Sequence, residues 1–259
     1  MSLHRLFAST FLLLGAACGR IGFEEVALGD QGPRDQGDLT DQASADEGTD
    51  AADVGSDAGT NGLASSCAFD SITVILDGDG NDAQAGATMA TAVANGCATT
   101  PTVMTRNQTE PGLLDPTTFA PLFGASSLGV LGGDAIVQNV MGYLMMSSAP
   151  IRVDTSNGRY RVILQSGGAV LLDAAIADIN GSHDYAVVQI VHDPPSQATV
   201  VATHGYIYQG TLAGAHYFST VLAPGLPLET RTYFVLEWTD MNGDMLPNAA
   251  DTYTLLTSG

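Results

Sequence analysis

Lysine is absent from the sequence, and this absence shapes the charge of the whole chain. The eight basic residues are all arginine and stand against 28 aspartates and glutamates, which gives a formal net charge of −20. The phosphate groups of nucleic acids and anionic lipids are bound mainly by Lys and Arg, so this balance disfavours both as partners. Metal cations are the natural counter-charge, and the composition favours an exported protein.

The signatures of common catalytic sites are also missing. The chain has no Gly-x-Ser-x-Gly, no His-Glu-x-x-His and no P-loop. No i, i+2 or i, i+4 spacing typical of a metal site relates any two of His183, His192, His204 and His216. His204 ends a predicted strand, and Asp184 or Asp193 could pair with it for acid–base chemistry. A non-enzymatic role is favoured, and a hydrolase of unknown substrate that uses His204 and a nearby carboxylate is the alternative.

No hydrophobic run is long enough to span a bilayer, which takes roughly 20 residues. The apolar run at residues 6–14, preceded by His4 and Arg5, instead suits the core of a signal peptide. It ends in Gly15-Ala16-Ala17-Cys18. We therefore expect residues 1–17 to be a signal peptide.

Small residues ahead of Cys18 resemble the lipobox of bacterial lipoproteins. The resemblance implies that Cys18 is acylated, becomes the new N-terminus and anchors the protein in a membrane. One departure is that the family prefers Leu three residues before the cysteine, where this chain has Gly15. Ordinary secretion with an unmodified Cys18 is the alternative. Gly19 replaces the Asp that resembles an inner-membrane retention signal, so the predicted location is the outer membrane or cell surface.

Between Cys18 and residue 66 the chain is acidic and lacks an apolar period. Such a stretch buries too little surface to offset its chain entropy, so residues 18–66 are predicted to be a lipidated cysteine followed by a disordered linker. As a flexible coil the linker would hold the domain on the order of 40 Å from the membrane.

Only three cysteines occur. If Cys18 carries lipid, Cys67 and Cys97 remain as a pair in an oxidising compartment, which predicts a disulfide. Two buried thiols are the alternative.

Residues 67–259 are predicted to form a single globular α/β domain. Strands are expected at residues 71–76, 102–105, 127–131, 151–154, 159–164, 185–191, 199–203, 232–238 and 252–256, and helices at 82–96, 135–146 and 212–221. Asp82 and Asp134 are predicted to cap the first two helices, with Gly96 as a helix stop. Residues 169–179 fit either a strand or a helix. The alternation predicts a mainly parallel sheet flanked by helices, with added antiparallel hairpins.

Three stretches resemble an α/β domain of archaeal surface-layer proteins. They are Leu131-Gly132-Gly133-Asp134-Ala135, the strand at residues 185–191, and residues 200–205 with the following helix that begins Gly210-Thr211. Asp134 stands where the family has Pro. The resemblance covers residues 71–221 and implies a structural or assembly role at the cell surface, with no catalytic residue.

The most specific chemical signal is the loop at residues 240–251. Counted from Asp240 as position 1, oxygen donors occupy positions 1, 3, 5, 7, 9 and 12, through Asp240, Asn242, Asp244, the carbonyl of Leu246, Asn248 and Asp251. This is the ligand spacing of an EF-hand-type loop, it resembles the calcium loops of dockerins and thrombospondin-type repeats, and hard oxygen donors suit Ca²⁺.

Two departures weaken the match. Met245 occupies position 6, where the family has Gly at positive φ, and position 12 is Asp and not Glu. The flanking strands also make this a hairpin loop. A plain turn is the alternative to a calcium site. The sequence thus predicts a lipid-anchored envelope protein with a structural or binding role, calcium-stabilised, with the membrane and other envelope proteins as partners.

Overall fold

The structure is a computed structural model of the chain and describes residues 62–133 and 138–259. They form ten strands and three α-helices, with short 3-10 and π turns between them. None of these helices has the length and apolar character needed to cross a membrane. The predicted signal peptide, Cys18, nearly all of the predicted linker and Asp134 lie outside the described residues.

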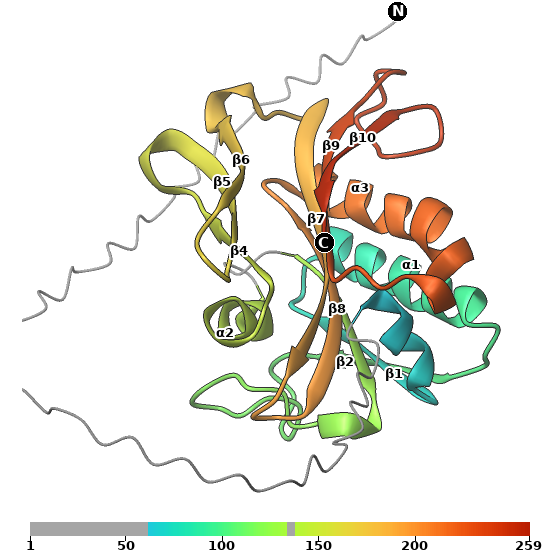
Figure 1. Cartoon of the computed structure of the whole chain (residues 1–259). Coiled ribbons are helices and arrows are strands. Elements are labelled where there is room, and N and C mark those ends of the chain that lie inside the picture. The colour runs from blue at the N-terminus through green and yellow to red at the C-terminus, as the bar shows by residue number, and fades with distance from the viewer. Residues whose placement is uncertain (1–61, 134–137) are drawn as a thin grey trace, which may run out of the picture. The chain divides into compact units, whose positions relative to one another are not determined.

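Seven strands form one mixed sheet in the order β10-β9-β7-β8-β3-β1-β2 (Figure 1). They are β1 Ser71–Leu76, β2 Thr102–Asn107, β3 Leu128–Gly132, β7 His183–Asp193, β8 Ala198–Gly205, β9 Tyr233–Thr239 and β10 Thr252–Ser258. Neighbours from β2 to β8 run parallel. Neighbours from β8 to β10 run antiparallel.

A second sheet holds the three antiparallel strands β4 Ile151–Asp154, β5 Arg159–Leu164 and β6 Val170–Ala175. The hairpin predicted between β4 and β5 is confirmed, because Asn157 and Gly158 turn the chain with φ of 57° and 68°. Asn and Gly adopt this left-handed conformation at lower cost than other residues, which suits them to the turn between β4 and β5. The ambiguous segment at residues 169–179 resolves largely as strand β6.

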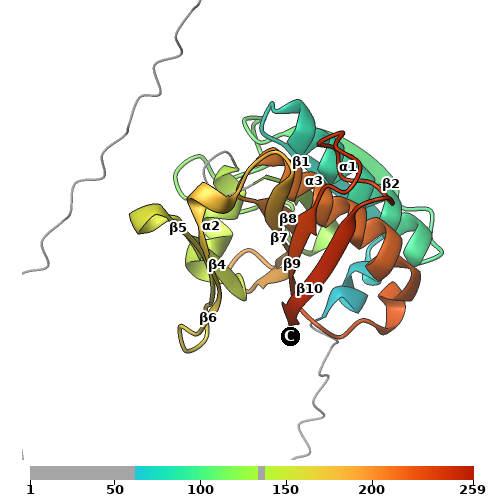
Figure 2. The same ribbon diagram turned by 90° about the horizontal axis from the view of Figure 1, so that it is seen from above.

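Three helices cover the two faces of the large sheet. They are α1 Gly80–Gly96, α2 Asn139–Ser147 and α3 Tyr208–Tyr217. Helices α1 and α3 lie on one face, and α2 with the small sheet lies on the other (Figure 2). Small residues let α1 approach closely, since a Cβ added at Gly86 would lie 3.1 Å from the Val74 side chain.

The prediction of a mainly parallel α/β fold is wrong. The described part of the chain is mostly β, with a mixed large sheet, a wholly antiparallel small sheet and few helices. The strand directions differ from the prediction because several connections between strands are short. Strands β7 and β8 are joined by the short turn at residues 194–197, and β9 and β10 by the loop at residues 240–251, and such hairpin links leave their strands antiparallel.

Helix α1 also departs from its predicted caps. Asp79, not Asp82, caps its N-terminus, accepting hydrogen bonds from the backbone N–H groups of Asn81 at 2.7 Å and Asp82 at 3.4 Å. Gly96 is the last helical residue and does not adopt positive φ. Its missing Cβ instead makes room for the Ala223 carbonyl, which would lie 2.3 Å from an added Cβ.

The predicted disulfide is present. Cys67 and Cys97 are bonded, with their Cα atoms 5.2 Å apart. The bond joins the short helix η1, Leu63–Ala68, to the end of α1, and both cysteines pack against the core beneath α1 and α3.

Candidate functional site

The loop between β9 and β10 holds all six predicted calcium ligands. Its strands pair from Thr239 and Thr252 onwards, so the two ends of the loop are held at adjacent positions. The N–H of Asp240 donates to the Ser182 carbonyl at 2.9 Å, which fixes the first position of the loop to the turn before β7. The site is thus a rigidly mounted, exposed hairpin loop.

Asp240 organises the first half of the loop. Its Oδ1 accepts hydrogen bonds from the backbone N–H groups of Asn242 at 3.0 Å and Gly243 at 2.7 Å, and its Oδ2 accepts one from Met245 at 2.8 Å. Desolvation alone would raise the pKa of Asp240, but the backbone donors together outweigh it, and the pKa lies below its usual value. Asp240 is therefore a stable carboxylate at neutral pH.

Met245 has the backbone conformation that position 6 of such a loop requires. Its φ is 58°, in the left-handed region where the family places glycine. A residue with a Cβ pays about 1 kcal/mol or more for this conformation. The bond from the Met245 N–H to Asp240 helps to hold the turn in spite of that cost.

The second half of the loop converges on Asp244. Its Oδ1 accepts from the Leu246 N–H at 2.9 Å, and its Oδ2 accepts from the side-chain amides of Asn242 at 3.0 Å and Asn248 at 3.1 Å. The Asn248 amide also donates to the Leu246 carbonyl at 2.7 Å. Hydrogen bonds therefore connect four predicted ligands, Asn242, Asp244, Leu246 and Asn248, mainly through Asp244.

Asp251, the predicted position 12, holds the two ends of the loop together through hydrogen bonds to Trp238 and to the loop backbone. Its Oδ2 accepts from the buried indole N–H of Trp238 at 3.1 Å and the Asn248 N–H at 2.9 Å, and its Oδ1 accepts from the Met241 N–H at 3.1 Å. Within residues 62–133 and 138–259, no group of three or more His, Cys, Asp and Glu side chains is placed to hold a metal ion. Asp251 is thus engaged by Trp238 and the backbone, which leaves Asp240 and Asp244 as the loop's other two carboxylates.

His204, the predicted acid–base residue, is fully buried and contacts no carboxylate among its described hydrogen bonds. Its Nε2 lies 3.3 Å from the Gln189 side-chain nitrogen, and its Nδ1 has no partner in the described structure. Burial lowers the pKa of His204 to about 4. The residue is therefore a neutral imidazole that is fully buried in the core.

Neither predicted acid partner reaches His204. Asp184 accepts hydrogen bonds from four backbone N–H groups: Tyr185 beside it, Tyr206 and Ile207 before α3, and Gly210 in the first turn of α3 at 2.8 Å. Asp193 is at the far end of β7, where it accepts hydroxyl hydrogen bonds from Tyr143, Ser148 and Ser196. Both carboxylates stabilise local backbone through these hydrogen bonds. Most of their partners are distant in sequence or lie in turns, so the sequence alone does not indicate this role.

The remaining histidines are also kept apart. His183 Nε2 lies 2.8 Å from Glu237 Oε1, His192 Nδ1 lies 3.2 Å from the Thr199 hydroxyl, and His216 stacks on Tyr253. The four histidines do not assemble into a metal set.

The loops at the carboxyl ends of β1 and β3 line a small cleft of about 180 Å³ with the Gly205–Tyr208 turn. Asp79 and Asp82, which follow β1, are among the residues that line this cleft. Carboxylates here disfavour the binding of a phosphate group, and Asp79 already serves as the cap of α1.

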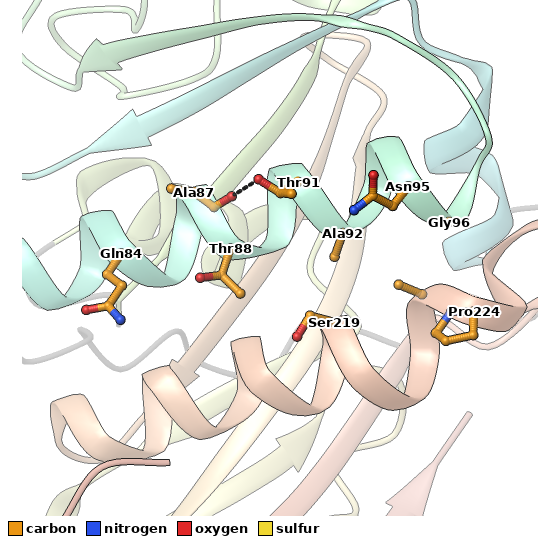
Figure 3. Close-up of a pocket in the computed structure, with 10 residues that line it drawn as sticks. Gln84, Ala87, Thr88, Thr91, Ala92, Asn95, Gly96, Ser219 and Pro224 are labelled. Atoms are coloured by element: carbon orange, nitrogen blue, oxygen red, sulfur yellow. Dashed lines mark hydrogen bonds between the residues drawn. The ribbon is translucent and has the colours of Figure 1, made fainter. Parts of the chain in front are cut away.

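A larger groove of about 550 Å³ runs between α1 and the turns after α3 (Figure 3). Its lining has no ionisable side chain and consists of Gln84, Ala87, Thr88, Thr91, Ala92, Asn95, Gly96, Ser219, Ala223 and Pro224. Thr91 turns its hydroxyl back to the Ala87 carbonyl at 3.0 Å, which occupies the donor. The groove therefore offers shape but no reactive group.

No protein-family model, curated protein or solved structure matches the chain. The function has to be inferred from the residues and contacts described above.

Proposed function

We propose that the chain is a lipid-anchored cell-envelope protein whose domain has a structural or binding role, and that the β9–β10 loop takes up Ca²⁺. The anchor rests on the sequence before Cys18. The loop conformation is the observation that carries the calcium part, because side-chain oxygens at positions 1, 3, 5 and 9 fold back on the backbone and position 6 has positive φ. Within the described residues the hydrogen-bond partner of the His204 ring is Gln189 and not a carboxylate, which favours the binding role over the hydrolase.

Asp240, Asn242, Asp244 and the Leu246 carbonyl are the proposed ligands. The side-chain amides of Asn242 and Asn248 donate hydrogen bonds to the Asp244 carboxylate in the described loop. A cation would replace these weak donors, and Asn242 would rotate to present its oxygen. Asp251 remains bonded to Trp238 and serves as the closing residue. With two central carboxylates the site suits the weak extracellular class, with a Kd of about 10⁻⁴ to 10⁻³ M.

Ten millimolar CaCl₂, roughly 10 to 100 times that Kd, is expected to raise the melting temperature of the full chain. Binding to the folded state alone at this excess stabilises it by about 1.4 to 2.7 kcal/mol. For a domain of this size that corresponds to roughly 3 to 10 °C. The measurement is a thermal melt in CaCl₂ against chelator.

The controls separate binding from charge screening, which any salt brings to so acidic a chain. Equal MgCl₂ should give a clearly smaller rise, since Mg²⁺ demands octahedral ligands. Asp244→Asn keeps an oxygen for the Leu246 N–H but lacks the charge, and should remove the calcium response. If the melting temperature of the parent protein is the same in CaCl₂ and MgCl₂, the loop is a plain turn and the calcium proposal is wrong.

A further inference from the structure

Strand β2 is an open edge of the large sheet. It is last in the strand order and pairs only with β1 among the described strands. Residues 102–105 are exposed, and Val103 and Met104 keep 49% and 45% of their surface accessible. Apolar side chains are therefore exposed to solvent on a strand whose outer edge has no described neighbour.

Backbone geometry identifies the free groups. The N–H of Thr102 donates to Asp70 at 2.9 Å and that of Gln108 donates to Leu76 at 2.7 Å, so even-numbered residues bond to β1. Residues of a parallel strand alternate between its two sides, and the N–H and C=O groups of Val103 and Thr105 point outward. No hydrogen bond joins these four groups to another described residue.

Backbone groups at the two ends of this segment are not available for pairing with another strand. The Asn107 N–H donates to Glu110 Oε1 at 2.9 Å, and the Asn107 carbonyl accepts from the Glu110 N–H at 2.9 Å. At the other end Pro101 has no N–H to donate. The usable edge is therefore Val103 and Thr105, symmetrically placed about Met104.

Edge strands are commonly protected by charge, proline or a bulge. The opposite edge, β10, has a bulge between Leu255 and Thr257. Strand β2 pairs with β1 in unbroken register and has no charged residue at 102–105. Its edge is thus left competent to pair with another strand.

We infer that β2 pairs antiparallel with β2 of a second copy of this chain, with the twofold axis at Met104. Val103 then exchanges two backbone hydrogen bonds with Thr105 of the second copy, and Thr105 exchanges two with its Val103. In this register Pro101, which lacks a donor, faces Asn107, whose groups are already bonded. The segment is complementary to itself at its centre and at its ends.

Charge favours a second copy at this edge. The chain has no Asp or Glu from Ala83 to Thr109, although its net charge is −20. Two copies of so acidic a chain repel each other, but β2 and most of α1 carry no acidic side chain, and Glu110 just after β2 is paired with Arg106. The exposed Met104 side chains meet across the axis and lose water contact on pairing.

Cross-linking of full chains with Cys18→Ser, which removes the unpaired thiol, tests the register. In Met104→Cys the two new cysteines oppose each other as a non-hydrogen-bonded pair with Cα atoms about 4.5 Å apart, within disulfide range. In the control Thr102→Cys, equally exposed, they lie roughly 14 Å apart along the strands. A covalent dimer from Met104→Cys alone supports the pairing. Equal dimer from both variants, or from neither, contradicts it.

Sedimentation of the Cys18→Ser chain at about 100 µM tests the assembly, with a roughly doubled mass expected for a twofold dimer. Thr105→Pro removes one outward N–H and leaves the β1 pairing intact, which an edge strand tolerates. It should sediment as a monomer with an unchanged unfolding transition. A monomeric parent, or a folded Thr105→Pro dimer, overturns the proposal. If Thr105→Pro does not fold, the cross-linking pair decides.

Discussion

Removal of the Cys67–Cys97 disulfide is expected to lower the free energy of unfolding by about 3 to 4 kcal/mol, if the unfolded chain behaves as a simple polymer. The bond closes a segment with a sequence separation of 30 residues that holds β1 and α1. Without it the unfolded chain gains conformations that the folded chain does not. Cys67→Ala with Cys97→Ala should therefore melt roughly 6 to 16 °C below the parent.

The matched control is the parent protein under reducing conditions. Reduction opens the same bond without changing a side chain, so its melting temperature should fall by a similar amount. The double variant should be insensitive to the reductant. A parent protein whose melting temperature does not respond to complete reduction, checked by thiol labelling of Cys67, would contradict the assignment of this bond as a main stabiliser.

Acid is expected to destabilise the fold through His204. Burial lowers its pKa to about 4 from the ordinary value of 6.5. Between these values the unfolded chain binds a proton and the folded chain does not, so the free energy of unfolding falls as the pH falls. The slope is about 1.4 kcal/mol per pH unit and the loss by pH 4 is about 3 kcal/mol. Above pH 6.5 the contribution is fully present and constant.

Asp184 acts in the opposite direction over part of this range. Burial raises its pKa to about 6, although four backbone N–H donors lower it. Between about pH 6 and the ordinary carboxyl value of about 3.9 the folded state takes up the proton first, so this group adds stability as the pH falls. The parent profile is the sum of two opposing slopes.

His204→Gln separates the two contributions, because glutamine is neutral at every pH and Asp184 is unchanged. Urea unfolding at several pH values from 7 to 4 should show the variant gaining about 3 kcal/mol on the parent as the pH falls. Parallel profiles for the two proteins would mean that His204 is already protonated in the folded state or is accessible to water.

Local patterns predicted most strands of the fold. The β-branched run of β1 and the Asn157-Gly158 hairpin between β4 and β5 were found at the predicted residues. Strand direction was predicted wrongly as mainly parallel, because it depends on which strands pair across the sheet and not on the composition of any one strand. The segments after β7 and β9 are rich in turn-forming residues, but such residues do not show whether the two strands that they connect are neighbours in the sheet.

The candidate site shows the same limit. The spacing of Asp240, Asn242 and Asp244 predicts an EF-hand-type loop, and in the structure their side-chain oxygens fold onto the loop backbone. Met245 counts in the sequence as a departure from that pattern, but its φ is positive, as position 6 requires. Asp251 was assigned to the same set, but its place depends on the indole of Trp238, which only strand pairing brings near. Asp184 and His204 were linked by type alone, whereas β7–β8 register sets Val187 opposite His204.

The state of Cys18 tests the proposed envelope anchor most directly. Mass spectrometry of the protein from the membrane fraction should find a mature chain that begins at an acylated Cys18, and Cys18→Ser should move the protein to the soluble fraction. A soluble mature chain with an unmodified Cys18, or a chain not cleaved before it, would contradict the account.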